Sequence, residues 1–318
     1  MPRFDVTIAG ELNLDLILYG LPEPLPPERE VLAERMTVTL GSSSAIVAHN
    51  LAALGSRVGF QSRIGDDPLG EIALDRLAQA GVDVSLVRRA AGPIKSGLTV
   101  ILQHPGGRNI LTYPGTIAEL RASDLDLDYL SSARHFHLSS FYLQSALRPS
   151  LPELFQKLKT AGLTVSLDTN DDPEDRWQGG LRDVLRYVDV FLPNAREACR
   201  IAGTDDLECA VTQLAELVPT VVVKTGREGA IAVRGKQKFR SPALRVTSVD
   251  PVGAGDSFDA GFLHQYIRGA DLPVCLAYGN LAGAFSTTRP GGTEAFRDRE
   301  YREGFFREHC ISVPAELS

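Results

Sequence analysis

Short apolar runs alternate with longer amphipathic stretches along this chain of 318 residues. Residues 5–10 are a compact apolar run that ends in glycine, which is typical of a buried strand. Residues 42–54 instead carry small residues at helical spacing, and Gly55 follows where a glycine commonly ends a helix. Because strand and helix patterns alternate in this way, the chain predicts a mainly parallel sheet covered by helices on both faces. Further helices are predicted over 69–80, 149–161 and 258–267, and further strands over 31–40, 163–168, 188–192 and 221–225.

One segment departs from this alternation. Residues 96–113 have the pattern of a β-hairpin, with Pro105 and two glycines at the turn. Together with the region before residue 40, this hairpin is expected to form a small separate sheet. We therefore expect one α/β domain over residues 1–310 that carries β-lid segments near 14–40 and 96–115.

Composition narrows the classes of function. The formal net charge of −7 argues against a general nucleic-acid binder, which usually has a basic balance or a dense Lys/Arg patch. No run of about 18 apolar residues occurs, so no membrane span is expected. Acidic residues interrupt the apolar amino terminus, which disfavours a signal peptide, and we expect a soluble protein of the cytoplasm. The four cysteines have neither CxxC nor zinc-site spacing and are expected to be free thiols: Cys199, Cys209, Cys275 and Cys310.

The segment 249–258 (VDPVGAGDSF) carries the strongest chemical signal and leads into a predicted helix. Small residues at 253–255 let the backbone approach a ligand closely, and amides at a helix start make an anion site with the helix dipole. Asp256 follows directly, where a carboxylate would repel phosphate. This arrangement is reasonable if Asp256 faces an acceptor hydroxyl while the amides hold a phosphoryl group. The alternative is that Asp256 caps the helix and the glycines form a tight turn.

These residues resemble a known family. Asp250 to Phe258 match the carboxy-terminal signature of the ribokinase-like (PfkB) carbohydrate kinases almost position for position. The amino-terminal signature, which starts at Gly41, is altered, since the family pattern usually begins Gly-Gly and has Asn where Ile46 stands. The resemblance keeps the family's order from about residue 4 to about residue 295. Further matches are Asn13-Leu14-Asp15, Leu192 to Glu197, Lys224 to Gly229, and Thr288 to Gly292.

The resemblance implies a three-layer αβα sandwich with a mainly parallel central sheet and a small β-sheet lid, and a homodimer formed through that lid. It implies an ATP-dependent sugar kinase that transfers the γ-phosphate of ATP to a hydroxymethyl group of a sugar or sugar-like substrate, with Mg²⁺ and a candidate K⁺. Asp256 would be the general base, and the amides of Gly253, Ala254 and Gly255 the anion hole. The chemistry agrees, because phosphoryl transfer needs positioning, charge neutralisation and modest help from a base.

The same resemblance assigns further residues to the acceptor pocket, to the nucleotide site with its Mg²⁺, and to a monovalent cation site beside the anion hole. Mg²⁺ would be organised through water, and the monovalent cation by a carboxylate and backbone oxygens. The residues so assigned are Asp15, Asn13, Gly41 and Ser42 for the acceptor, Asn194, Lys224, Gly226, Gly229 and Asn280 for the nucleotide, Glu197 for Mg²⁺, and Asp250, Val252, Arg289 and Gly291 for the monovalent cation.

Several of these residues, and others nearby, also fit ordinary structural roles. Asn194 and Glu197 match a helix capping box, and Asp15 would be unremarkable at the end of a strand. His135 and His137 alternate on an apparent strand and share one side, but no third metal ligand at compatible spacing is evident. Trp177, the one tryptophan, fits either the core or a pocket wall.

Two other functions stay open: a nucleoside kinase of the same fold, and a catalytically idle sugar-binding protein, which the altered segment 41–46 suggests. A dinucleotide-binding Rossmann site is not favoured, because no GxGxxG follows the first strand, and no P-loop motif occurs. Ile46 can neither donate nor accept a hydrogen bond, and Ser42 narrows the pocket. The substrate therefore stays open among ribose, fructose, a keto-deoxy acid and a nucleoside, with weak activity expected on ribose.

Overall fold

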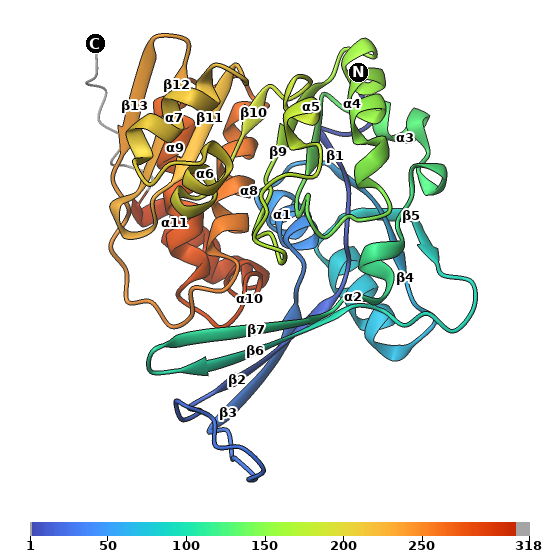
Figure 1. The fold of residues 1–318 in the computed structure, drawn as a ribbon, viewed down its shortest axis with the longest axis vertical. Helices are drawn as coiled ribbons and strands as arrows, with labels where there is room; N and C mark the ends of the chain where they lie inside the picture. Colours follow the sequence, from blue (N-terminus) through green and yellow to red (C-terminus); the bar gives the residue numbers. More distant parts are fainter. Residues whose placement is uncertain (1, 310–318) are drawn as a thin grey trace.

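The computed structural model describes residues 2–309 and contains two β-sheets of different build (Figure 1). The larger sheet has the strand order β13-β12-β11-β10-β9-β8-β1-β4-β5. Its neighbours are parallel from β5 to β11, and β12 and β13 are added antiparallel. The predicted mainly parallel sheet is therefore confirmed. Its strands are β1 (Val6–Ala9), β4 (Val58–Ile64), β5 (Asp83–Arg89), β8 (His135–Leu138), β9 (Thr164–Leu167), β10 (Val190–Phe191), β11 (Thr220–Lys224), β12 (Ala230–Arg234) and β13 (Gln237–Ser241).

Local sequence signals set the ends of several helices. The Asp67 side chain accepts hydrogen bonds from two backbone amides at one helix start. Gly55, Gly81 and Gly162 follow three helices with φ of 93°, 89° and 91°, a left-handed backbone that glycine adopts without strain. The helices predicted before these glycines are confirmed to within two residues. The helices are α1 (Ser43–Ala53), α2 (Pro68–Gln79), α3 (Leu127–Ser131), α4 (Leu151–Thr160), α5 (Leu181–Leu185), α6 (Ala195–Ala202), α7 (Leu207–Ala215), α8 (Ala254–Tyr266), α9 (Leu272–Ser286), α10 (Glu294–Arg297) and α11 (Arg299–His309).

The large sheet separates two apolar cores. Along β11, Val221 and Val223 pack into a cluster that includes residues of α4 and α7, whereas Val222 packs into a second cluster with residues of α1, α8 and α9. This alternation follows from the two-residue period of a strand. Helices therefore lie on both faces of the sheet, and the three-layer αβα sandwich is confirmed (Figure 1).

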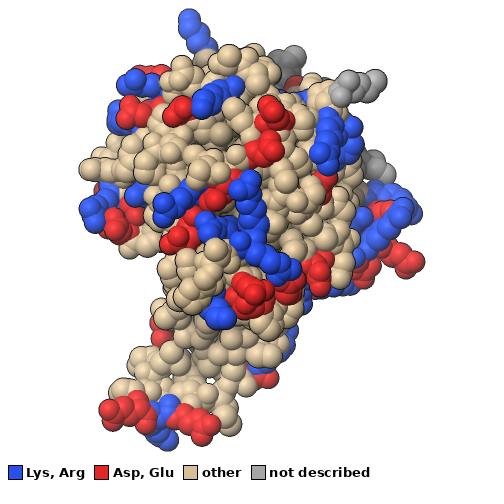
Figure 2. All heavy atoms as spheres, turned by 90° about the vertical axis from the view of Figure 1, so that its right-hand side faces the viewer, with Lys and Arg blue, Asp and Glu red and all other residues tan. Residues whose placement is uncertain are grey.

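The smaller sheet is the lid, with strands β2 (Leu14–Tyr19), β3 (Arg35–Leu40), β6 (Leu98–His104) and β7 (Gly107–Tyr113) in the order β3-β2-β6-β7. It confirms the predicted hairpin and projects from the body, largely without charged side chains until its tip (Figure 2). Asp15 lies opposite Thr39 and Thr99, so these three residues share one face of the lid. On that inner face, Ile17 and Ile101 form a small apolar cluster with Val252 of the main body.

Two predicted boundaries are wrong. The strand predicted over 31–40 begins at Arg35, and the helix predicted from residue 258 already begins at Ala254. The earlier helix start follows from Gly253, whose φ of 73° makes it the N-cap. In residues 2–309 no helix is long and apolar enough to cross a membrane. The predicted free thiols at 199, 209 and 275 are confirmed, whereas Cys310 and the domain end at 310 lie outside the described residues.

Candidate active site

Polar residues gather where the parallel strands of the large sheet end. Glu11 follows β1, Ser140 follows β8, Asp168 and Asn170 follow β9, and Lys224 ends β11. The carboxyl ends of neighbouring parallel strands meet at one edge of a sheet, which is where α/β proteins commonly bind ligands. The lid continues from β1 at this same edge, so its inner face covers it (Figure 1).

The predicted anion site lies at the start of α8. A Cβ on Gly253 would come within 2.4 Å of the Gly292 Cα atom, so the close approach and the positive φ both require glycine there. Gly253 has no side chain to cap the helix, and among the described residues the amides of Gly255 and Asp256 have no hydrogen-bond acceptor. The Ala254 amide differs, because it donates to the Pro251 carbonyl at 3.3 Å. Two free amides thus remain at the positive end of the helix dipole.

Asp256 lies in the first turn of α8 and is not the N-cap, so the capping alternative is wrong. Asp256 is 9% exposed. Burial raises the pKa of Asp256 to about 6, with a further contribution from the Asp168 charge that Lys224 partly offsets. Such a value is suited to a base that works near neutral pH.

A buried ion cluster lies directly beneath the anion site. The Lys224 ammonium contacts Asp168 at 2.7 Å and Asp259 at 3.1 Å, and all three side chains are nearly or fully buried. A Cβ on Gly255 would lie 3.7 Å from Lys224 Nζ, which places the ammonium close to the helix start. Burial alone would lower the pKa of Lys224, but the two aspartates hold it above its ordinary value. Burial also raises the pKa of Asp259, and Asp168 stays ionised beside the lysine.

Asn194 and Glu197 form the capping box that their spacing predicts. The Asn194 side chain accepts from the Glu197 amide at 3.0 Å, and the Glu197 carboxylate accepts from the Asn194 amide at 2.8 Å. Burial raises the pKa of Glu197 to about 8, and the Asp168 charge adds to this effect. The capping role is confirmed, and it leaves the carboxylate beside the Asp168–Lys224 pair.

The residues predicted for the acceptor pocket lie at the base of the lid. Asp15 is the second residue of β2, so the strand-end interpretation is wrong. A Cβ on Gly41 would come within 2.0 Å of Asp15 Oδ1, and the Gly41 amide donates to the Asn13 carbonyl at 3.0 Å. Ser42 has a φ of 69° and caps α1. Burial, followed by the charges of two other aspartates, raises the pKa of Asp15 to about 7.

The residues predicted for the nucleotide site lie around the end of β11 and on α9. Gly226 has a φ of 61°, and a Cβ on Gly229 would come within 2.0 Å of the Ser241 carbonyl oxygen. The Asn280 side chain donates to the carbonyls of Ser241 and Pro242 at 3.0 and 3.1 Å. Gly229 and Asn280 thus hold the 241–242 segment in place, and the side chain of Lys224 points into the ion cluster.

Asp250, predicted to bind a monovalent cation, already accepts four hydrogen bonds. Two come from the amides of Val252 and Gly291 at 3.0 and 3.1 Å. The other two come from the lid, from the Tyr19 hydroxyl at 2.6 Å and the Gln103 side-chain amide at 3.3 Å. The Asp250 carboxylate therefore ties the lid to the loop that precedes the anion site. The Arg289 side chain points away from this predicted cation site, because its guanidinium pairs with Asp298 at 2.8 Å.

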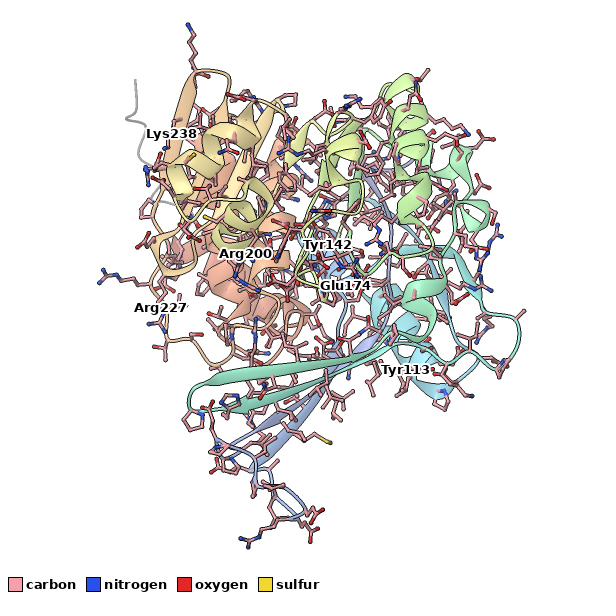
Figure 3. The ribbon with its side chains drawn as sticks, in the orientation of Figure 1. Tyr113, Tyr142, Glu174, Arg200, Arg227 and Lys238 are labelled. Carbon is pink, nitrogen blue, oxygen red and sulfur yellow. The ribbon has the colours of Figure 1, made fainter. Side chains whose placement is uncertain are left out.

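The other residues that the sequence singled out have structural partners. His135 and His137 hydrogen-bond through Ser166, and their outer ring nitrogens contact the hydroxyls of Thr164 and Ser139. Trp177 belongs to the apolar core, and its ring lies 5.6 Å from that of Tyr142. Figure 3 shows Tyr142 and Glu174, from the loops that follow β8 and β9, in the middle of the molecule above the lid.

Sequence reasoning missed five residues of this site: Glu11, Ser43, Asp168, Asn170 and Asp259. Asp259 stands three positions after Asp256, and residues at that spacing share one face of a helix. Asp168 and Asn170 follow a predicted strand, so the edge rule for parallel sheets could have found them. Glu11 likewise follows the strand predicted over 5–10, and Ser43 lies in the segment that starts at Gly41. The partners of Glu11 could not be foreseen, because it accepts from the distant Ser140 and Gln144.

Comparisons with known proteins identify the family. The pfkB family carbohydrate kinase model matches residues 3–299. A fructokinase from Klebsiella pneumoniae is 33% identical, covering 80% of this chain and 88% of that protein, and a 2-dehydro-3-deoxygluconokinase from Bacillus subtilis is 29% identical over 84% and 86%. A ribokinase II candidate from Escherichia coli, solved with ATP and Mg²⁺, superposes with a TM-score of 0.84 at 25% identity over 96% and 100% of the two chains. The chain therefore belongs to the PfkB family and is an ATP-dependent carbohydrate kinase with the ribokinase fold.

Proposed function

We propose that this enzyme transfers the γ-phosphate of ATP to a hydroxymethyl group of a sugar or sugar-like acceptor, with Asp256 as general base. One observation carries the proposal: the buried Asp256 carboxylate lies in the same helical turn as two free amides. The amides favour the phosphoryl group, and the pKa of about 6 leaves Asp256 ionised at neutral pH.

The acceptor would lie between the inner face of the lid and the start of α8. There Asp15 accepts hydrogen bonds from its hydroxyls, with Asn13, Gly41 and Ser42 around it. Asp256 takes the proton of the reacting hydroxyl as the phosphoryl group is transferred. The lid excludes water, which would otherwise compete as acceptor.

The nucleotide would lie along the turn Gly226–Gly229, with Asn280 supporting the neighbouring segment. Its phosphates would meet the proposed anion hole (Gly253, Ala254 and Gly255), where the Gly255 amide is free within the described residues. Glu197, held by Asn194, suits an ion bound through water, since burial and the Asp168 charge favour a nearby cation. Mg²⁺ bound there would neutralise charge on the phosphates. Lys224 adds a fixed positive charge beneath them.

The test is an ADP-release screen with Mg-ATP over neutral sugars, sugar acids, sugar phosphates and nucleosides. We expect release that depends on one acceptor, with mass spectrometry showing a stoichiometric phosphate ester. Ile46 is 2% exposed and packs against Gly253 and Gly292, so it gives no reason to expect weak turnover of ribose. ADP release that no acceptor increases would contradict the kinase function.

A nucleoside kinase is the second candidate, since a Nucleoside kinase from Methanothermobacter thermautotrophicus is 27% identical over 88% of this chain. Thermal stabilisation by adenosine or cytidine, but not by free sugars, would favour it. A catalytically idle sugar-binding protein is disfavoured, because Asp256 and the free amides are both in place.

A monovalent cation beside the anion hole would be held by backbone oxygens of Val252, Arg289 and Gly291, with Asp250 fixing that loop. Potassium would then stiffen the loop and raise turnover. The measurement is the rate in potassium and in tetramethylammonium at matched ionic strength. Equal rates would contradict a cation site.

The outer face of the lid supports a homodimer. Met36, Leu111 and Tyr113 are 61%, 53% and 55% exposed and lie on the face opposite Asp15. An exposed apolar face of this kind commonly marks a protein interface. Light scattering should give a dimer that Leu111→Arg converts to a monomer with kinase activity reduced but not lost. We place the enzyme in the cytoplasm, which supplies ATP and keeps thiols reduced.

A further inference from the structure

The acceptor side carries a buried carboxylate with no hydrogen-bond partner. Asp15 is 5% exposed, and no group in residues 2–309 donates a hydrogen bond to its carboxylate. Its position on β2 places it on the same lid face as Ile17 and Tyr19, which contact the anion-site loop. Buried polar groups are normally hydrogen-bonded, so this carboxylate is poised for donors that a ligand brings.

The charges around this position are mainly negative. The fields of Asp256 and Asp250 reach Asp15, and both raise its pKa. Lys224 is engaged by Asp168 and Asp259 and so is not free to pair with an anionic acceptor. Arg108, on β7, lowers the pKa of Asp15, but its effect is smaller than that of either aspartate, and Arg108 is solvent-exposed.

We propose that the acceptor is an uncharged polyhydroxy compound, a neutral sugar or a nucleoside, rather than a sugar acid or a sugar phosphate. The inference rests on the kinase function proposed above and narrows its substrate class. Hydroxyl groups supply the donors that the Asp15 carboxylate lacks. A carboxylate or phosphate on the acceptor would instead meet the negative charge of Asp256 and, wherever its carboxyl is ionised, that of Asp15.

The size of the discrimination follows from Coulomb's law. Two unit charges about 7 Å apart, in a medium of effective dielectric constant about 20, change a binding constant by roughly 50-fold. Solvent near the mouth of the site reduces this effect. We therefore expect neutral acceptors to be favoured by about 10-fold or more over charged acceptors of the same skeleton.

The test uses pairs that share a carbon skeleton and in which one member carries a negatively charged group. D-fructose is paired with 2-dehydro-D-gluconate, which replaces a hydroxymethyl by a carboxylate, and D-ribose with D-ribose 1-phosphate; adenosine extends the neutral arm. The measured quantity is kcat/KM for ADP release with Mg-ATP. The proposal predicts that the best acceptor overall is neutral, and that the neutral member leads in each pair in which either member is turned over.

A charged member with the highest kcat/KM overturns the proposal while leaving the kinase function intact. If no acceptor in the panel supports ADP release and none of them stabilises the protein thermally, both the kinase function and this inference are contradicted. Two variants refine the result. Asp15→Asn should narrow the ratio between members of a pair by about 5-fold or more, because one of the two negative charges is gone. Arg108→Gln should still prefer the neutral member of each pair. If wild type prefers the charged member and Arg108→Gln prefers the neutral one, Arg108 recognises the acid and the proposal is contradicted.

Discussion

The buried acidic groups on the two sides of this site are neutralised in different ways. On the phosphate side, Asp168 and Asp259 share the Lys224 ammonium at 2.7 and 3.1 Å. On the acceptor side, Asp15 is equally buried but receives no hydrogen bond from the described chain. The paired aspartates have their cation within the protein, whereas Asp15 lacks a donor that a ligand could supply. The comparison thus separates residues that support the site from residues available to bind the acceptor.

The largest effect is expected from replacing Asp256, the proposed general base, which lies between the phosphate side and the acceptor side. Asp256→Asn keeps the size of the side chain but removes the proton acceptor. Loss of a general base costs about 10²–10⁴ in rate, or roughly 3–5.5 kcal/mol of transition-state stabilisation. The decrease should appear in kcat, with nucleotide affinity nearly unchanged.

The pH profile supplies the control for this variant. Because the pKa of Asp256 is about 6, wild-type activity should fall as pH drops below that value and the carboxylate takes up a proton. The Asn variant should lack this limb of the profile. Near-wild-type kcat in a folded Asp256→Asn enzyme would falsify the assignment of the base.

The fold should be strongly destabilised when the buried ion cluster loses its lysine. Lys224→Met leaves Asp168 and Asp259 buried without a cation, and breaking a buried pair in this way costs about 3–5 kcal/mol of unfolding free energy. Denaturant titration measures the change. Lys159→Met is the matched control, since its pair with Asp189 has side chains 34% and 23% exposed, and its loss should cost about 1 kcal/mol or less. Equal losses of unfolding free energy in the two variants would show that the buried cluster contributes no more than an exposed ion pair.

Removal of the unpaired carboxylate, Asp15, should instead stabilise the fold at high pH. The pKa of Asp15 rises to about 7 on folding, so its contribution to stability is greatest below the unfolded value of about 3.9 and is lost as pH rises through 7. Asp15→Asn should therefore raise the unfolding free energy at pH 8, by at most about 4 kcal/mol, with little difference at pH 4.

Acceptor binding gives the second measurement on this variant. KM for the acceptor should rise in Asp15→Asn even though the protein is more stable, because the carboxylate that accepts its hydroxyls is gone. A variant that loses stability at pH 8 would mean that Asp15 is already satisfied within the protein.

Local sequence patterns predicted the parallel sheet, the helix ends marked by glycine, and the anion-site turn, because each depends on neighbouring residues. The ion cluster was not predicted, since Lys224 meets its partners across 56 and 35 residues of chain. Ile46 shows the same limit. The sequence suggested an apolar pocket wall, but this side chain is 2% exposed and packs beneath Gly253 and Gly292. Pairings across the fold depend on how its elements pack, which a linear pattern does not contain.

The smallest effect is expected at the contact that joins the two sides. The Tyr19 hydroxyl of the lid donates to Asp250 at 2.6 Å, and the Asp250 carboxylate also holds two amides of the loop before the anion site. Tyr19→Phe removes one hydrogen bond to a buried charged group, which is worth about 1.5–3 kcal/mol when the lid is closed. Part of this loss should be recovered when the lid opens and water reaches Asp250.

We therefore expect a 3–10-fold rise in KM for the acceptor, which is roughly 0.7–1.4 kcal/mol. A looser lid admits water, so acceptor-independent ATP hydrolysis should rise relative to acceptor phosphorylation. Steady-state rates with and without acceptor measure this ratio. Thr99→Val, on the same lid face but without a bond to Asp250, is the control and should leave ATP hydrolysis unchanged. If Tyr19→Phe lowers stability but leaves both KM and the hydrolysis ratio at wild-type values, the contact only supports the fold. A change in the ratio would instead mean that lid closure and the phosphate side are coupled through Asp250.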